Sequence, residues 1–315
     1  MAPALATAMT STVTGDHIVG AILGGAIGDG WGGPYEGGVP HASAQAPNEL
    51  VVSDDTLLTL ATCEAIVEAG AVVPEQIAAR FVAWYRDGKL RGLGASTMKA
   101  LRDLDAGAHW ALAGAKGERA AGNGAAMRIA PLAFLLDPAD DRDRRTLRDV
   151  CRITHHHEEA YVGALAIVVA IRLASSPGRP ATGLLADVAA VLPDSQVRDR
   201  LLRYAGFPDS VTVLQIAETW GSSGFVVDSV PLAIFAARQI GTRTFVELIG
   251  DVVQAGGDTD TIASMAGQIA GATVGSAGLP PEMLVRLREG EAIGAIARAF
   301  AAMTRPRVAS GRSAT

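Results

Sequence analysis

Two short acidic segments are the part of this sequence best able to do chemistry. The first is Ser-Asp-Asp-Thr at residues 53–56, where an irregular stretch gives way to a periodic apolar segment. Serine and aspartate are common at helix N-termini, because their oxygens accept hydrogen bonds from free backbone N–H groups. Asp54 and Asp55 cannot both serve one cap, since neighbouring side chains on a helix point about 100° apart. Metal binding by Ser53, Asp54 and Asp55 therefore stands beside the capping interpretation.

The second segment is Asp-Thr-Asp-Thr at residues 258–261, which follows two glycines and again precedes an apolar helical stretch. Asp258, Asp260 and Thr261 offer three oxygen donors within four residues, and Mg²⁺ and Mn²⁺ prefer such hard ligands. Taken alone, the segment is also explained as a glycine turn followed by an acidic cap.

Considered together, the two segments predict a metal centre. Four ionised carboxylates buried together would repel one another severely without cations. Two divalent ions would balance the four charges, and a two-metal site can orient substrate hydroxyls and activate a water. The sequence is therefore predicted to encode a metal-dependent hydrolase.

A glycine-rich segment at residues 20–38 is predicted to form a mobile or tightly turning loop. Glu36 within it could act over a ligand as an acid, a base or a lid residue, and a plain surface glutamate is the alternative. No convincing strand precedes the glycines, so a dinucleotide-binding fold is not predicted.

A second glycine-containing segment is Gly-Asn-Gly-Ala-Ala-Met-Arg at residues 122–128. Asn-Gly favours left-handed turns, and the backbone N–H groups of such a turn could cradle a diphosphate. The alternative is a loop that simply enters a helix.

Three adjacent histidines at residues 155–157 invite a zinc interpretation, which we do not favour. Adjacent residues on a helix face different ways, and the sequence has no HExxH pattern. His155 and Glu159 are spaced to share one helix face. We expect a surface histidine run with one functional member.

The elements that must position these groups are predicted to be helices. Apolar residues recur at one-turn spacing in three segments, residues 57–65, 160–171 and 262–270. Asp228 and Ser229 are predicted to cap a helix whose first turn holds Pro231. Residues 50–53 are the best strand candidate. We predict a compact, single-domain, all-α fold over residues 16–304, between a disordered leader at residues 1–15 and a disordered tail at residues 305–315.

Composition narrows the function classes. The chain has 315 residues, 49% of them hydrophobic, with a net charge of −6 and no basic stripe, so nucleic acid is not expected as a partner. The longest apolar run falls short of the roughly 20 residues needed to span a bilayer, and no signal peptide is evident. Two distant cysteines form no disulfide framework, so we expect a cytoplasmic protein, and a monomer is the plainest expectation.

These segments, in this order, resemble the ADP-ribosylglycohydrolase family over roughly residues 16–302. The motifs at residues 53–56 and 257–261 carry the resemblance, and residues 122–128 and 223–228 add independent support. The resemblance implies a compact all-α fold and a binuclear Mg²⁺ or Mn²⁺ centre. The metal ligands that it implies are Ser53, Asp54, Asp55, Asp258, Asp260 and Thr261.

The resemblance also implies the remaining site residues. Catalytic roles fall to Glu36, Asp54, Asp55 or Asp258, without a choice of base or acid. The implied substrate-binding residues are Gly122, Asn123, Gly124, Met127, His155, Gly224 and Phe225.

The activity implied by the resemblance is hydrolysis of the bond between C1″ of ADP-ribose and an attached acceptor, which is a protein or a small molecule. Arginine-linked ADP-ribose is the leading substrate class, and O-linked ADP-ribose, on serine or as an acetyl ester, is the alternative. Two alternatives belong to other functional classes. One is a catalytically silent relative that binds ligand or plays a structural role. The other is a two-metal hydrolase that acts on phosphoesters.

Overall fold

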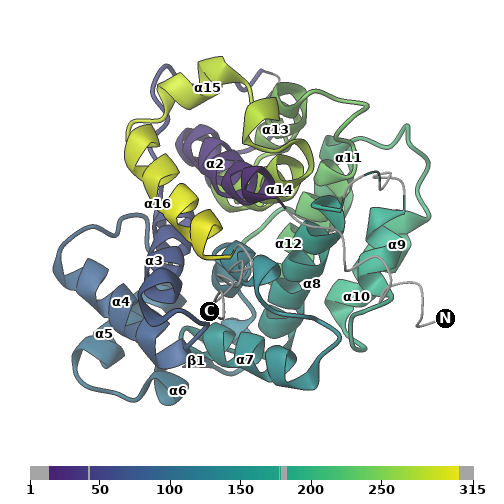
Figure 1. Ribbon diagram of the computed structural model, residues 1–315. Coiled ribbons are helices and arrows are strands. Elements are labelled where there is room, and N and C mark those ends of the chain that lie inside the picture. The colour runs from purple at the N-terminus through teal and green to yellow at the C-terminus, as the bar shows by residue number, and fades with distance from the viewer. Residues whose placement is uncertain (1–13, 42, 177, 179–182, 305–315) are drawn as a thin grey trace, which may run out of the picture.

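Figure 1 shows the computed structural model of the chain, in which residues 14–41, 43–176, 178 and 183–304 are described. Helices make up almost all of its regular structure, which confirms the predicted all-α class. The α-helices of the described residues are, in chain order, α2 (Gly15–Gly32), α3 (Asp54–Ala69), α4 (Pro74–Arg86), α5 (Ala95–Asp105), α6 (Trp110–Ala113), α7 (Asp141–Arg152), α8 (Glu158–Ala174), α9 (Leu184–Ala189), α10 (Gln196–Ala205), α11 (Val213–Trp220), α12 (Val226–Ala237), α13 (Phe245–Gln254), α14 (Thr259–Val274), α15 (Pro281–Arg286) and α16 (Gly290–Met303).

Shorter elements occupy the connections. The strands β1 (Ala115–Lys116) and β2 (His155–His156) pair in parallel as a small two-stranded sheet. The 3₁₀ helices are η1 (Gly33–Tyr35), η2 (Glu118–Ala120), η3 (Asn123–Ala125), η4 (Ala130–Phe134) and η5 (Ser276–Gly278).

Helices α2 and α14 lie side by side at the centre of the molecule, although they are far apart in the sequence (Figure 1). Glycines spaced four residues apart line one face of each helix, and these faces meet. A Cβ added to Gly24 would lie 2.3 Å from the carbonyl oxygen of Gly267, and one added to Gly271 would lie 2.1 Å from that of Gly20. The backbones touch, which only glycine permits. The pairing is antiparallel, so the C-terminal end of α2 lies beside the N-terminal end of α14.

The other helices pack around this pair. Helices α8, α12 and α13 contact α14, whereas α3 and α16 contact α2. The buried apolar side chains of all these helices form one continuous core, which confirms the single-domain fold. Both cysteines, Cys63 and Cys151, are buried free thiols. Among the described residues, no helix combines the length and the apolar character needed to cross a bilayer.

The prediction of a loop at residues 20–38 was wrong. Residues 20–32 continue α2, and their glycines serve helix packing rather than chain flexibility. Helix propensity penalises each glycine by about 1 kcal/mol, but the close contact with α14 outweighs that preference. The loop proper is confined to the residues that follow η1.

Two further local predictions were also wrong. Residues 50–53 form no strand, because Leu50 makes only an isolated bridge to Leu287. Helix α12 begins at Val226 with Phe225 at the N-cap position, so Asp228 lies inside the first turn and does not cap it. The predicted tail at residues 305–315 lies outside the described residues, as does most of the predicted leader, and Gly15 already belongs to α2.

Candidate metal centre and ligand site

The N-terminus of α3 is held by an aspartate from another helix. Asp29 of α2 is fully buried, and both of its oxygens accept a hydrogen bond from the backbone N–H of Ser53 at 2.9 Å. The backbone N–H and the hydroxyl of Thr56 also donate to Asp29, at 3.1 and 2.6 Å. Asp29 thus satisfies N–H groups that a helix start leaves free. It thereby fixes the turn that carries Asp54 and Asp55.

Within that turn, Asp55 receives hydroxyl donors from both acidic segments. Ser53 Oγ donates to Asp55 Oδ2 at 3.1 Å, and Thr261 Oγ1 donates to the same oxygen at 3.2 Å. The other oxygen, Asp55 Oδ1, is buried and has no hydrogen-bond partner among the described residues. Such an unpartnered buried acceptor is costly unless a ligand contacts it.

The start of α14 is shaped by two glycines. Gly256 and Gly257 have φ of 73° and 82°, in the left-handed region that glycine occupies without strain. A Cβ on Gly257 would also lie 2.2 Å from the carbonyl oxygen of Ser222. The turn places Asp258 at the N-cap and Asp260 in the first turn of the helix.

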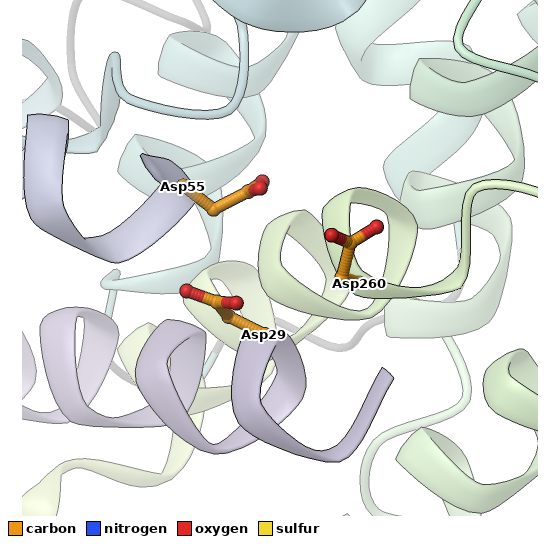
Figure 2. A group of neighbouring side chains, drawn as sticks. All are labelled: Asp29, Asp55 and Asp260. Atoms are coloured by element: carbon orange, nitrogen blue, oxygen red, sulfur yellow. The ribbon is translucent and has the colours of Figure 1, made fainter. Parts of the chain in front are cut away.

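Figure 2 shows how Asp29, Asp55 and Asp260 point from three helices toward a common space. One oxygen from each of these carboxylates lies within 4.8 Å of the others, and Glu36, Asp258 and Asp260 form a second group with the same property. Asp260 belongs to both groups. The structure therefore brings the two predicted segments together and adds Glu36 at the exposed edge.

The carboxylates of this cluster are shifted toward their neutral forms. Burial, followed by the charge of Asp260, holds the pKa of Asp55 well above its usual range. Burial, followed by Asp258, raises the pKa of Asp260 to about 8. Burial, followed by Asp29, raises the pKa of Asp54 to about 8. If these carboxylates were all ionised, they would therefore carry more negative charge than their own hydrogen-bond donors compensate.

Divalent cations fit this arrangement. The available donors are carboxylate and hydroxyl oxygens, which Mg²⁺ and Mn²⁺ prefer over nitrogen or sulfur. The unpartnered Asp55 Oδ1 and the raised pKa values of Asp54 and Asp260 both fit a site that accepts positive charge. Among the described residues, Asp54 lies outside both groups of mutually close carboxylates.

Asp29 was not predicted as a site residue. Its oxygens already accept the three donors of Ser53 and Thr56, so we assign it to support of α3 and not to direct metal coordination. In the sequence Asp29 stands out only as the one carboxylate among the glycines and apolar residues of 18–32, and its burial is seen only in the structure. Fully buried aspartates are rare unless they are paired or hydrogen-bonded.

Glu36 follows η1 and is exposed, unlike the aspartates it faces. The loop that carries Glu36 is hydrogen-bonded to Gly257, just before the N-terminus of α14. Gly37 N donates to the carbonyl of Gly257 at 2.8 Å, and Gly257 N donates to the carbonyl of Gly38 at 3.0 Å. Partial burial and then Asp258 raise the pKa of Glu36.

The segment at residues 122–128 lies against the same cluster. Asn123 begins η3, and its Nδ2 donates to Asp258 Oδ2 at 2.5 Å and to Ser229 Oγ at 3.1 Å. Asn123 N donates to the carbonyl of Gly224 at 3.0 Å, and Gly122 bridges Phe225. The predicted ligand residues Gly122, Asn123, Gly224 and Phe225 are thus neighbours.

Two of the predicted ligand residues are more deeply buried than expected. Met127 is only 3% exposed and belongs to the hydrophobic core, with its carbonyl accepting from Gln268 Nε2 at 2.6 Å. His155 is 3% exposed and lies beside Gly124, so the prediction of a surface histidine run was wrong for this residue. His155 belongs to β2, whereas α8 begins at Glu158, so His155 and Glu159 do not share a helix face.

The chain is similar in sequence to a known protein family and to several of its relatives. The sequence profile of the ADP-ribosylglycohydrolase family matches residues 9–309 of the chain. An uncharacterised protein of Archaeoglobus fulgidus is 31% identical over 268 residues, which cover 80% of this chain and 85% of that protein.

Two relatives with named activities are similarly distant. The ADP-ribosylhydrolase ARH3 of Danio rerio is 28% identical, and the alignment covers 83% of this chain and 83% of that protein. The ADP-ribosylarginine hydrolase Tri1 of Pseudomonas putida is 27% identical over 86% of this chain and 74% of its own. A solved ADP-ribosylglycohydrolase-related protein complex contains a chain that superposes with a TM-score of 0.72 at 26% identity, covering 92% of this chain and 99% of that one.

Proposed function

The chain belongs to the ADP-ribosylglycohydrolase family, and we propose that it is a metal-dependent hydrolase that releases ADP-ribose from an acceptor by cleaving the glycosidic bond at C1″. The observation that carries this proposal is the convergence of Asp55, Asp258 and Asp260 with Glu36 at an exposed edge. The acceptor is a protein or a small molecule that carries ADP-ribose.

Two divalent cations, Mg²⁺ or Mn²⁺, are proposed as cofactors. The residues that would hold them share oxygen donors at the starts of α3 and α14, and they are Ser53, Asp54, Asp55, Asp258, Asp260 and Thr261. When bound, such cations supply positive charge that neutralises the carboxylates and attracts the oxygens of substrate and water.

Glu36 is the residue that we assign to proton transfer. Hydrolysis forms a bond between C1″ and a water oxygen and breaks the bond from C1″ to the acceptor. One proton leaves the water, and the departing acceptor atom gains a proton. Glu36 is exposed, while Asp54, Asp55 and Asp260 are 6% exposed or less, so it can meet both water and substrate. Its raised pKa brings its proton exchange closer to neutral pH, where an acid–base group works best.

The remaining predicted ligand residues would hold the ADP-ribose moiety. Gly122, Asn123 and Gly124 offer a turn with close backbone approach, and Gly224 and Phe225 lie against it. His155 packs on the same turn, and Met127 supports it from the core. The Asn123–Asp258 hydrogen bond joins this ligand loop to the acidic cluster.

Arginine-linked ADP-ribose is the proposed substrate class. The similarity to two Tri1 proteins, over 86% and 90% of this chain, supports it. The second candidate is O-linked ADP-ribose, which the similarity to ARH3 proteins supports. A guanidinium nitrogen and a hydroxyl oxygen differ as leaving groups, so the two substrates separate these candidates directly.

The test uses peptides that carry ADP-ribose on arginine or on serine, incubated with the purified chain and Mg²⁺ or Mn²⁺. Chromatography of the free ADP-ribose should show release from the arginine peptide and none after chelation of the cations. Release from serine alone would assign the second candidate. Release from neither peptide, with ADP-ribose still bound, would favour a silent binding relative over an enzyme.

Glu36→Gln provides the matched control, because it removes the proton-transfer group and keeps the side-chain shape. Turnover should fall by roughly 10²- to 10⁴-fold, the contribution of a positioned acid–base group, while Mn²⁺ affinity stays close to that of the wild type. Unchanged turnover would remove Glu36 from the mechanism.

A further inference from the structure

Arg128 is a fully buried cation at the end of the segment at residues 122–128. Its side chain is 0% exposed, and its guanidinium carbon lies 5.0 Å from the centre of the Phe81 ring. Nη2 donates to Thr154 Oγ1 at 2.6 Å and, more weakly, to the carbonyl of Val150 at 3.5 Å. Burying a charge is costly, so an arginine at this place calls for an explanation beyond packing.

The contact from Arg128 decides the direction of the hydrogen bond between Thr154 and His155. A guanidinium only donates, so Thr154 Oγ1 must accept from Arg128. The hydroxyl still has one hydrogen of its own to donate. The acceptor found for it among the described residues is His155 Nδ1, at 2.8 Å. Nδ1 of His155 is therefore the acceptor in this pair.

The same surroundings keep the imidazole of His155 neutral. Burial, followed by the positive charge of Arg128, lowers the pKa of His155 to about 3. A neutral imidazole carries one proton, on either Nδ1 or Nε2. Because Nδ1 accepts from Thr154, the proton resides on Nε2, which makes Nε2 a donor.

Nε2 lies against the ligand loop. A Cβ added to Gly122 or to Gly124 would be 3.3 Å from His155 Nε2, so both glycines leave this nitrogen room beside the loop backbone. Between them stands Asn123, whose side chain contacts Asp258 of the acidic cluster. Nε2 of His155 therefore lies beside the same loop whose Asn123 contacts the acidic cluster.

We propose that Arg128 and Thr154 are positioning residues that hold His155 as its Nε2–H tautomer, so that His155 donates a hydrogen bond to an oxygen of ADP-ribose bound along the loop at residues 122–124. The identity of the ligand rests on the proposed function, whereas the tautomer rests on the protein alone. A packing role for Arg128 and Thr154 would place no requirement on which nitrogen of His155 carries the proton.

The tautomer is read directly by nitrogen NMR of histidine-labelled protein at neutral pH, with His155→Gln identifying the resonances of His155. In the wild type, Nε2 should show the shift of a protonated nitrogen and Nδ1 that of an unprotonated one. Thr154→Val removes the hydroxyl while it keeps the branched shape, and Thr154→Ser restores the hydroxyl. We expect the valine variant to lose the fixed tautomer and the serine variant to retain it.

Binding of ADP-ribose in the presence of Mn²⁺, measured by calorimetry, supplies the second measurement. Thr154→Val should weaken it by roughly 2- to 10-fold, the value of one neutral hydrogen bond, and Thr154→Ser should recover it. Arg128→Met should give the same weakening, and the Thr154 pair carries the test if that variant does not fold.

A wild-type His155 protonated on Nδ1 would overturn the inference, as would a Thr154→Val variant that keeps both tautomer and affinity. A wild type that shows the expected tautomer but binds no ADP-ribose would contradict the proposed function and, with it, the donor role of His155.

Discussion

The N-termini of α3 and α14 carry the same kind of acidic turn, but they are held in different ways. At α3, the buried Asp29 of a neighbouring helix accepts from Ser53 and Thr56. At α14, Asp258 makes no side-chain capping hydrogen bond, and its carboxylate accepts from Asn123 of the ligand loop instead. One acidic turn is thus fixed by a buried carboxylate of α2, and the other is connected to the loop at residues 122–124, which we propose binds ADP-ribose.

The two acidic turns look alike in the sequence, but their different supports suit them to different tasks. The α3 turn is held from the core, because both oxygens of Asp29 accept hydrogen bonds from it. The α14 turn is joined to the loop at residues 122–124 by the hydrogen bond from Asn123 to Asp258. We infer that α3 mainly sets the position of the cations and that α14 mainly couples them to substrate.

The largest effect is expected at Asp260, which belongs to both groups of close carboxylates. Asp260→Asn should abolish binding of the cations and lower hydrolysis by roughly 10³-fold or more, since bound metal contributes several kcal/mol to the transition state. Calorimetric titration with Mn²⁺ and the release of ADP-ribose measure the two losses.

Asp103→Asn is a suitable control for charge removal, because Asp103 lies on α5, pairs with Lys99 and is outside the cluster. It should leave both measurements unchanged. If Asp260→Asn bound Mn²⁺ like the wild type, Asp260 would not be a ligand, and the two acidic turns would not share a cation through it.

The next effect is a pH dependence of stability in the chelator-treated protein. Burial raises the pKa of Asp54, at α3, and of Asp260, at α14, to about 8. Folded-state values above the unfolded ones mean that the folded state binds more protons, so this contribution is complete below about pH 4 and is lost as pH rises through about 8. Denaturant unfolding between pH 6.5 and 8.5 should show stability falling by a few kcal/mol.

This interval avoids an opposing contribution. The pKa of His155 is lowered to about 3, so its effect on stability is confined to pH values below about 6.5. Saturating Mn²⁺ should cancel the decline, because a cation favours the ionised carboxylates. If stability declined equally with and without Mn²⁺, the two aspartates would not be its cause.

Parts of the fold and the site follow directly from the sequence. Apolar periodicity correctly indicated α3, α8 and α14, since these helices bury whole faces or more. The acidic turns were recognisable because each carries two aspartates within three residues, more than one helix cap uses. Local chemistry of this kind needs no knowledge of distant partners.

Other parts depend on contacts between distant segments and could not be predicted. The glycines of α2 looked like a loop because their partner, the glycine face of α14, lies more than 200 residues away in the sequence, as the Thr259–Gly32 contact at a separation of 227 shows. Asp29 was overlooked for the same reason, since its partners Ser53 and Thr56 belong to another helix. His155 was placed on a helix face, but pairing with Ala115 put it in β2.

The smallest of the three effects tests the support of the two turns. Asp29→Asn keeps the side-chain shape but presents an N–H₂ group to donors that need an acceptor. The α3 turn should loosen, and Mn²⁺ affinity should fall by roughly 10- to 100-fold, as is usual when a partner behind a metal ligand is changed. Asn123→Ala removes one neutral donor from Asp258 and should lower Mn²⁺ affinity by only roughly 2- to 10-fold. Circular dichroism checks that both variants are folded. Equal losses would mean that the two turns are supported alike, whereas a larger loss at Asn123 would contradict the inference that α3 mainly sets the position of the cations.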